Sequence, residues 1–259
     1  MPDHKLPFTA HLEELRKRFI ICFIAIGVGF LACYAFKEKL FEFMAIPLLG
    51  SLPEHNSWMI FTGVSEAFFT YLKVSFLGGL FLALPVVFYQ FWAFVAPGLY
   101  KNEKMVAVPF VIFSTVFFVA GSSFGYFVVF PFGFKFFMGF ASDGIRPFPS
   151  VKEYFSFATK LLLAFGLVFE LPVISYFLSR IGLLSYKTLA KNRRYAIVIA
   201  FILSSALTPP DVATQLMMAG PLVILFEVSV QVARIFGKKP LTDEEGNLRD
   251  EEEPGEPAG

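Results

Sequence analysis

Carboxylates that lie beside or within long apolar stretches are the groups in this sequence best suited to chemistry. Glu14 and Glu103 stand among Lys and Arg residues next to apolar runs, whereas Glu170 and Glu227 lie inside such runs. Glu14 and Glu103 can each form a solvated ion pair with a neighbouring base, or together they can bind a cationic peptide. A carboxylate inside a membrane is costly, so Glu170 and Glu227 indicate polar contacts for a partner helix, a proton path or structural hydrogen bonds.

Catalytic and metal-ligand patterns are absent from the sequence. The histidines His4, His11 and His55 all lie outside the apolar runs, and the sequence contains no His-Glu-x-x-His, no Gly-x-Ser-x-Gly and no phosphate-binding glycine loop. We therefore expect no catalytic residue, no metal and no cofactor. A secondary transporter is an alternative, because such proteins also use carboxylates and kinked helices within the membrane, but no inverted repeat is apparent.

The composition indicates that lipid surrounds much of the chain. Of its 259 residues, 56% are hydrophobic and 17% are charged, whereas a soluble domain carries about 25% charged residues. The net charge is +1 and no basic run is interleaved with aromatic residues, which argues against nucleic-acid binding. Cys22 and Cys33 fall in one apolar run, where a helix would hold them about 16 Å apart, too far for a disulfide.

The apolar runs predict an all-α integral membrane protein with six membrane-spanning helices. The spans cover residues of about 19–36, 74–96, 106–131, 157–179, 195–209 and 213–233. A span needs about 20 apolar residues, so the short fifth run requires a locally thinned bilayer or flanking side chains that reach out of it. Prolines in or beside most spans predict kinked helices that form a concave bundle, and Gly121 and Gly125 have the spacing of a close helix contact.

The basic residues predict that both termini lie in the cytoplasm. Most of the 22 Lys and Arg residues fall in segments that are inside if the N-terminus is inside. The basic residues 16–18 ahead of an apolar run also resemble a secretory signal, but the later spans favour a retained helix. Residues 1–236 would then form one transmembrane domain, and residues 237–259, rich in Asp, Glu, Pro and Gly, a disordered cytoplasmic tail.

Two long segments are predicted on the outer side of the membrane. Residues 37–69 mix apolar and charged side chains around Pro47 and Pro53, which predicts short amphipathic helices at the interface. Residues 135–155 contain Pro147 and Pro149 and are predicted to form a second outer loop.

Four stretches, in order along the chain, resemble the TatC family of the twin-arginine protein translocase. They read HLEELRKR at 11–18, LPVVFYQFWAFVAPGLYKNE at 84–103, FGLVFELP at 165–172 and LTPPDVATQ at 207–215. The resemblance covers residues of about 9 to 236. It implies a receptor in the inner membrane of a bacterium that binds the twin-arginine signal peptides of folded proteins at its cytoplasmic face. It also implies TatB-like and TatA-like single-span partners, homo-oligomers within the receptor complex, and transport driven by the proton-motive force.

The resemblance also implies roles for individual residues. Those of the signal-peptide site are Glu14, Arg16, Phe94, Pro97, Leu99, Tyr100, Lys101 and Glu103. Those of a concave groove and of partner-helix contacts are Glu170, Thr208 and Gln215. Pro47 and Asp211 match outer-face positions that are linked to assembly or activity.

Overall fold

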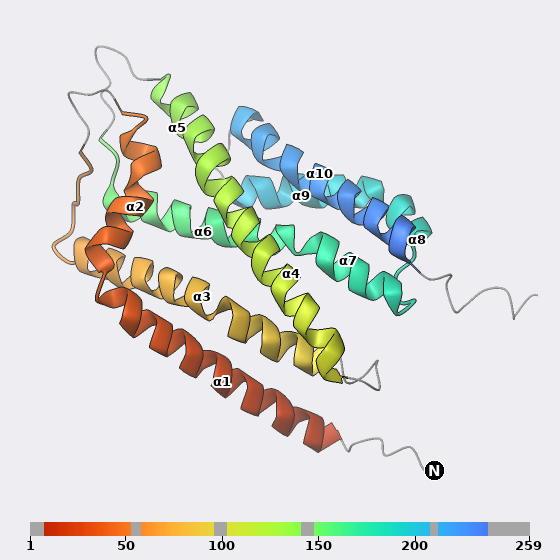
Figure 1. Cartoon of the computed structure of the whole chain (residues 1–259). Helices are drawn as coiled ribbons and strands as arrows, with labels where there is room; N and C mark the ends of the chain where they lie inside the picture. Colours follow the sequence, from red (N-terminus) through yellow and green to blue (C-terminus); the bar gives the residue numbers. More distant parts are fainter. Residues whose placement is uncertain (1–7, 53–57, 96–102, 141–147, 208–211, 238–259) are drawn as a thin grey trace, which may run out of the picture.

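Helices form nearly all of the computed structural model, which describes residues 8–52, 58–95, 103–140, 148–207 and 212–237 and contains no β-strand within them (Figure 1). The elements are α1 (Phe8–Tyr34), α2 (Lys37–Leu49), α3 (Glu66–Val95), α4 (Glu103–Phe124), η3 (Gly125–Val129, a π-helical turn), α5 (Phe130–Met138), α6 (Val151–Phe169), α7 (Leu171–Arg180), α8 (Tyr186–Lys191), α9 (Arg193–Leu207) and α10 (Val212–Phe236). The prediction of an all-α fold is confirmed.

Five helical stretches in the described part of the chain are long and apolar enough to cross a membrane. They are Leu12–Tyr34, Glu66–Val95, Val108–Met138, Val151–Arg180 and Val212–Phe236. Helix α9 has 15 residues, hence a length of about 22 Å against a hydrocarbon core of about 30 Å. The sixth span, the inward orientation of the N-terminus and the domain bounds therefore stay predictions. The predicted acidic tail lies outside the described residues from 238 onward.

Two of these stretches are interrupted beside a proline. Helix α6 ends where the N–H of Glu170 turns back to the carbonyl of Leu167 at 3.1 Å, and α7 begins with Pro172 in its first turn. Between α4 and α5 the backbone widens into the π-helical turn η3, directly ahead of Pro131. Proline cannot donate to the preceding turn, so the helix adjusts locally at each position. Helix irregularities thus accompany Pro131 and Pro172, whereas α3, α4 and α10 continue through Pro85, Pro109 and Pro221 without a break.

Glycines bring neighbouring helices into close contact. Helices α1 and α3 lie side by side (Figure 1), and a Cβ atom at Gly29 would lie 2.5 Å from the carbonyl oxygen of Gly79. A Cβ atom at Gly121 would lie 2.5 Å from the carbonyl oxygen of Phe165, and Gly125 faces Leu161. The close contact predicted from the spacing of Gly121 and Gly125 is therefore confirmed, and its partner is α6.

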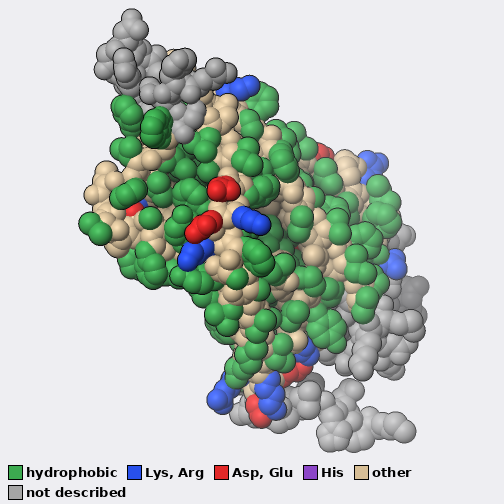
Figure 2. All heavy atoms as spheres, turned by 60° about the vertical axis from the view of Figure 1, so that its left-hand side comes forward, with side chains coloured by type: hydrophobic (Ala, Val, Ile, Leu, Met, Phe, Trp, Pro, Cys, Tyr) green, Lys and Arg blue, Asp and Glu red, His purple; other side chains and the backbone are tan. Residues whose placement is uncertain are grey.

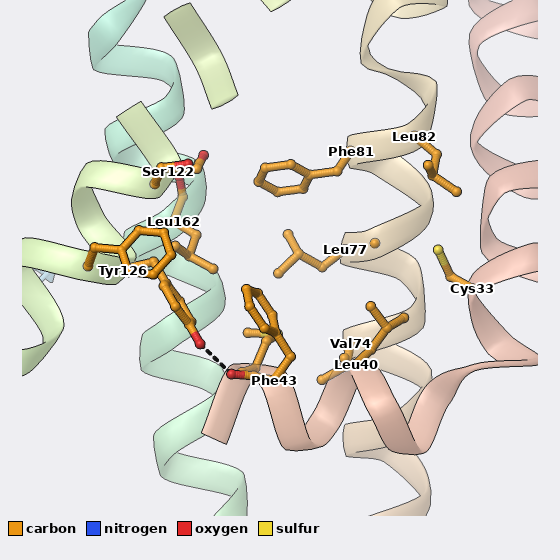
Figure 3. Close-up of a pocket in the computed structure, with 14 residues that line it drawn as sticks. Cys33, Leu40, Phe43, Val74, Leu77, Phe81, Leu82, Ser122, Tyr126 and Leu162 are labelled. Atoms are coloured by element: carbon orange, nitrogen blue, oxygen red, sulfur yellow. Dashed lines mark hydrogen bonds between the residues drawn. The ribbon is translucent and has the colours of Figure 1, made fainter. Parts of the chain in front are cut away.

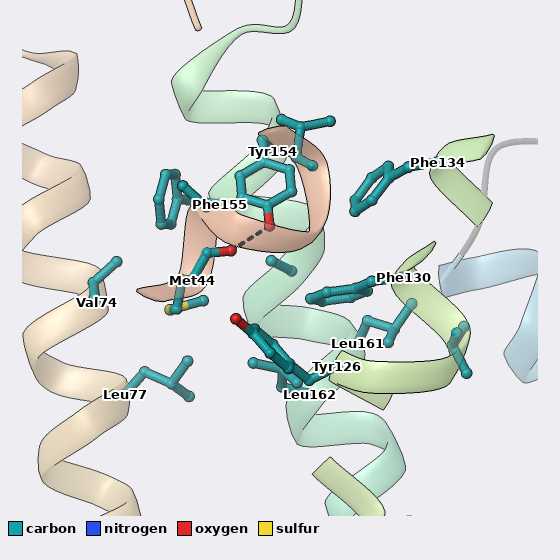
Figure 4. Packing of buried hydrophobic residues seen from close by; sticks show 14 of the residues in the cluster. Met44, Val74, Leu77, Tyr126, Phe130, Phe134, Tyr154, Phe155, Leu161 and Leu162 are labelled. Carbon is teal, nitrogen blue, oxygen red and sulfur yellow. Dashed lines mark hydrogen bonds between the residues drawn. The ribbon is translucent and has the colours of Figure 1, made fainter. Parts of the chain in front are cut away.

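The main hydrophobic core lies beneath α2, where that helix crosses the ends of α3, α6 and η3 (Figure 4). Phe155, Leu161 and Phe130 are almost wholly buried there. Tyr126 and Tyr154 donate hydrogen bonds to the consecutive carbonyl oxygens of Phe43 and Met44. Helix α2 is therefore fastened to the bundle by apolar packing and by two tyrosine hydroxyls.

The predicted outer loop 135–155 is too long. Helix α5 continues to Met138 and α6 begins at Val151, because the Phe-rich run after Pro131 keeps packing against the bundle. A parallel bridge links this region to the other outer segment: Ile60 donates to the carbonyl of Pro149 at 3.0 Å, and Val151 donates to the carbonyl of Ile60 at 2.9 Å. The two outer segments are thus joined by backbone hydrogen bonds.

Candidate functional site

The start of α1, the end of α3 and the start of α4 gather at one end of the molecule (Figure 1). Near the start of α1, Arg18 donates to Oε1 of Glu14 from Nη2 at 2.5 Å and from Nε at 3.1 Å. Its Nη1 donates to the side-chain oxygen of Gln90 on α3 at 3.3 Å. One guanidinium group therefore connects a carboxylate on α1 to an amide on α3.

The carboxylate of Glu14 keeps one oxygen available. Both hydrogen bonds from Arg18 go to Oε1, and no donor among the described residues reaches Oε2. The Glu14 side chain is 38% exposed and that of Arg18 is 20% exposed. Arg18 thus orients Glu14 through Oε1, while Oε2 has no donor among the described residues.

The structure describes only some of the remaining residues predicted for this site. Arg16 is exposed on α1, and Phe94 is half-buried in the last turn of α3, one turn after Gln90 and so on the same side of that helix. Glu103 is the first residue of α4, but its side chain lies outside the description. Outside the described residues also lie Pro97, Leu99, Tyr100 and Lys101.

Glu170 lies in the interior of the bundle at the break between α6 and α7. Its residue is 4% exposed, Oε1 finds no partner within the described part of the chain, and Ser114 lies near the carboxyl group. The indole of Trp92 donates to the hydroxyl of Ser114 at 2.9 Å. Polar groups on α3 and α4 thus lie near Glu170, in a region that is otherwise apolar.

Gln215 connects α10 to α9. Its side-chain amide donates to the carbonyl of Phe201 at 3.1 Å, and the hydroxyl of Ser204 donates to the backbone carbonyl of Gln215 at 2.7 Å. Gln215 also lines a shallow groove along α9 with Ile197, Val198, Phe201, Ile202 and Ser205. The predicted Thr208 and Asp211 lie outside the described residues.

Pro47 lies inside α2 and changes the hydrogen bonding of the backbone one turn earlier. Because proline has no N–H, the carbonyl of Phe43, four residues earlier, receives no helical hydrogen bond. The hydroxyl of Tyr126 donates to this carbonyl instead (Figure 3). Tyr126 thus supplies the donor that Pro47 removes from α2.

Several polar residues of the structure were not singled out from the sequence. The spacing of Glu14 and Arg18 indicated their pairing, but nothing in the sequence indicated Gln90 or Ser114, whose partners lie on other helices. Glu227, for which the sequence left several roles open, forms an ion pair of 2.6 Å with Arg193 across α9 and α10. This pairing identifies Glu227 as a link between the two helices.

Comparisons with known proteins agree with this arrangement. A family model described as TatC, Sec-independent protein translocase protein, matches residues 10–221. A Sec-independent protein translocase protein TatC from Desulforapulum autotrophicum is 58% identical over 94% of this chain and 90% of its own length. The one from Escherichia coli K12 is 41% identical over 92% of each chain. A crystal structure of the twin arginine translocase receptor TatC matches with a TM-score of 0.78 and 39% identity, over 87% of this chain and 98% of that one.

Proposed function

The chain belongs to the TatC family, and from that premise we propose that it binds twin-arginine signal peptides of folded proteins at its cytoplasmic face. Membership makes it a component of the Sec-independent protein translocase in a bacterial inner membrane, a transport protein rather than an enzyme. The orientation that this function needs has both termini and the start of α4 in the cytoplasm, with six spans in all.

The observation that best supports this proposal is that Oε2 of Glu14 has no donor among the described residues. A guanidinium group offers a planar fork of N–H donors that fits a carboxylate, whereas an ammonium group is a point charge. Arg18 occupies Oε1 and leaves Oε2 to an incoming arginine. Glu14 is partly exposed, so the peptide arginine is bound without the full cost of burying two charges.

A second carboxylate is needed for the second arginine of the pair. Glu103 opens α4 at the same end of the molecule as Glu14 (Figure 1). Phe94, on the same side of α3 as Gln90, offers apolar surface beside Glu14, and the loop residues Pro97, Leu99, Tyr100 and Lys101 complete the proposed site. Two separate acids select a pair of arginines more strongly than a single acid would.

Arg18 acts as a positioning residue in this proposal. Its bond to Gln90 ties the rotamer of Glu14 to the end of α3, where Phe94 lies. A single ion pair of this exposure contributes about 0.3–0.5 kcal/mol to helix stability. Its main effect is therefore to orient the Glu14 carboxylate before the peptide arrives.

Recruitment of TatB-like and TatA-like single-span proteins is proposed for the face formed by α9 and α10. Helix α9 exposes the apolar residues Val198, Ile199 and Ile202, and Gln215 supplies a polar group beside them. Polar side chains at apolar helix faces strengthen helix association in membranes by about 1 kcal/mol. Glu170 is proposed as a further polar contact, which a partner reaches only after α6 and α7 separate locally from α4.

Binding of a fluorescent twin-arginine peptide to the full chain in nanodiscs tests this function. We expect Glu14→Gln and Glu103→Gln each to weaken binding about tenfold, since a hydrogen bond to a charged group contributes about 1.5–3 kcal/mol. Glu13→Gln is the matched control, because Glu13 is the adjacent acid and pairs with Lys17. A twin-lysine peptide should bind more weakly than the twin-arginine peptide.

The Arg18→Lys variant tests the positioning role in the same assay. Lysine keeps the charge but cannot contact Glu14 and Gln90 together, so the preference for arginine over lysine peptides should fall several-fold. Lys17→Arg should leave the preference unchanged. Full binding and full arginine preference in a Glu14→Gln/Glu103→Gln double variant would overturn the proposed function.

A further inference from the structure

A cavity of about 340 Å³ lies between the α1–α3 pair and the α4–α6 pair, beneath α2 (Figure 3). Its volume falls in the range of small-molecule sites. Helix α2 contributes Leu40 and Phe43, α3 contributes Leu77 and Phe81, and Leu162 of α6 lies at the inner end of the cavity. None of the described residues of the proposed signal-peptide site lines it.

The lining of this cavity favours a hydrocarbon ligand over a polar one. The polar side chains Ser122 and Tyr126 border it, but the hydroxyl of Ser122 donates to the carbonyl of Leu162 at 2.9 Å and that of Tyr126 donates to Phe43. Neither hydroxyl proton is therefore available to a ligand, and the rest of the wall is apolar apart from Ser123. A polar ligand would lose its hydrogen bonds to water there without replacement.

The cavity opens sideways from the bundle, on a part of the chain that crosses the membrane. Leu82 and Phe127, at its edge, are 63% and 67% exposed. Figure 2 shows hydrophobic side chains over most of the visible surface, with charged side chains confined to a few groups. In a bilayer, this opening faces lipid acyl chains rather than water.

A cation stands at the end of the cavity wall nearest α2. The ammonium group of Lys37 lies 4.6 Å from the ring centroid of Tyr34 and 6.0 Å from that of Tyr71. Tyr71 is one turn before Val74 on α3, and Val74 lines the cavity. Lys37 is paired with no acid in the described part of the chain. The wall of the cavity thus ends in a positive charge that suits a phosphate.

We propose that this cavity is a binding site for one phospholipid of the leaflet that contains α2, with an acyl chain inside it and the phosphate at Lys37. Gly78 in the lining lets α3 pack closely on α1, since a Cβ atom there would lie 2.9 Å from the sulfur of Cys33. The bound lipid fills the space between the two helix pairs and braces α2 from below. This proposal does not depend on how the protein binds its cargo.

Photolabelling tests the site. The full chain is placed in nanodiscs that contain phosphatidylglycerol with a photoreactive acyl chain, and the labelled peptides are mapped by mass spectrometry. We expect labelling to concentrate on the lining segments of α3 and of α4 with η3. Ser123→Phe fills the cavity and should reduce this labelling at least threefold, whereas Val116→Phe, an exposed position elsewhere on α4, should not.

Lys37→Gln tests the headgroup contact, with Lys39→Gln as its control, because Lys39 is exposed and has no aromatic contact among the described residues. Only Lys37→Gln should reduce labelling by the anionic lipid relative to phosphatidylcholine. If Ser123→Phe fails to fold, Leu82→Trp at the opening serves instead. The proposal would be overturned if labelling spread evenly over the exposed helices or if neither filling variant changed it. Labelling that disappears once single-span partner proteins are present would also overturn it.

Discussion

Tyr126 makes a hydrogen bond that the backbone of α2 cannot make for itself. Pro47 leaves the carbonyl of Phe43 without its helical donor, and the Tyr126 hydroxyl takes the place of the missing N–H. The neighbouring carbonyl of Met44 differs, because the N–H of Leu48 is in place to donate to it and Tyr154 adds a second donor. At the scale of single residues, the hydrogen bonds of the two tyrosines therefore contribute unequally to the stability of the protein.

Tyr126→Phe should destabilise the protein by about 0.5–1.5 kcal/mol, the usual net contribution of a hydrogen bond, since this bond is only partly buried. Tyr154→Phe should have a smaller effect, because Met44 keeps its helical donor. Thermal unfolding of the purified protein in detergent measures both changes. In a Pro47→Ala background the backbone N–H returns, so Tyr126→Phe should then have little effect. Equal losses with and without Pro47 would show that Tyr126 acts through packing alone.

The sequence predicts local polar pairs at the residue scale but not the tertiary ones. Glu14 and Arg18 are four residues apart on a helix, which is enough to predict their ion pair. Gln90 joins this pair only because α1 and α3 pack in one particular register, and no spacing within the sequence encodes that register. The hydrogen bond from Trp92 to Ser114 depends in the same way on the packing of α3 against α4.

At the scale of elements, the packing of α1 on α3 holds the two halves of the Glu14–Arg18–Gln90 contact together. Gly29 is the point of closest approach, since its Cβ position is blocked by the backbone of Gly79. Backbone atoms cannot rotate away as a flexible side chain can, so any side chain at Gly29 must push the helices apart.

Gly29→Ala should therefore destabilise the protein by about 1–3 kcal/mol through overpacking. Gly27→Ala is the matched control on the same helix, because its Cβ position has nothing within 4 Å; it should be neutral or stabilising, since alanine favours the helix. Unfolding midpoints of the two variants measure the difference. Equal midpoints would mean that α1 and α3 are not held at this distance in the membrane.

Element-scale prediction from the sequence succeeded where a residue acts through its own backbone. Pro131 and Pro172 predicted helix irregularities, and Gly121 and Gly125 predicted a close contact. The outer loop 135–155 was predicted too long. Pro147 and Pro149 indicated a loop there, whereas tertiary packing extends α5 to Met138. No sequence pattern indicated the close approach of Gly29 to Gly79, since the two glycines lie on different helices.

At the scale of the whole molecule, the direction of the chain in the membrane decides which end meets the cargo. Most of the basic residues in the described part of the chain lie at the end where α1 begins, which predicts that this end is cytoplasmic. Arg193 and Glu227 form their ion pair near α8 and the end of α10, which Figure 1 places together.

Single cysteines test this orientation in a chain whose own Cys22 and Cys33 are replaced by serine. Ser65→Cys, exposed before α3, should react with a membrane-impermeant thiol reagent in cells whose inner membrane is intact. Thr188→Cys, exposed on α8, should react only after that membrane is permeabilised. The opposite pattern would put Glu14 on the outer side and exclude it from recognising cytoplasmic peptides.

The bridge between the two segments predicted on the outer side depends on a single residue, Ile60, whose N–H donates to Pro149 and whose C=O accepts from Val151. Only main-chain atoms take part, so the exposed side chain of Ile60 can change without removing either hydrogen bond. Proline is the exception at residue 60 or 151, where it would remove a donor, whereas residue 149 supplies only an acceptor and already is proline. The side chain of Val151 is constrained separately, by its burial in the core.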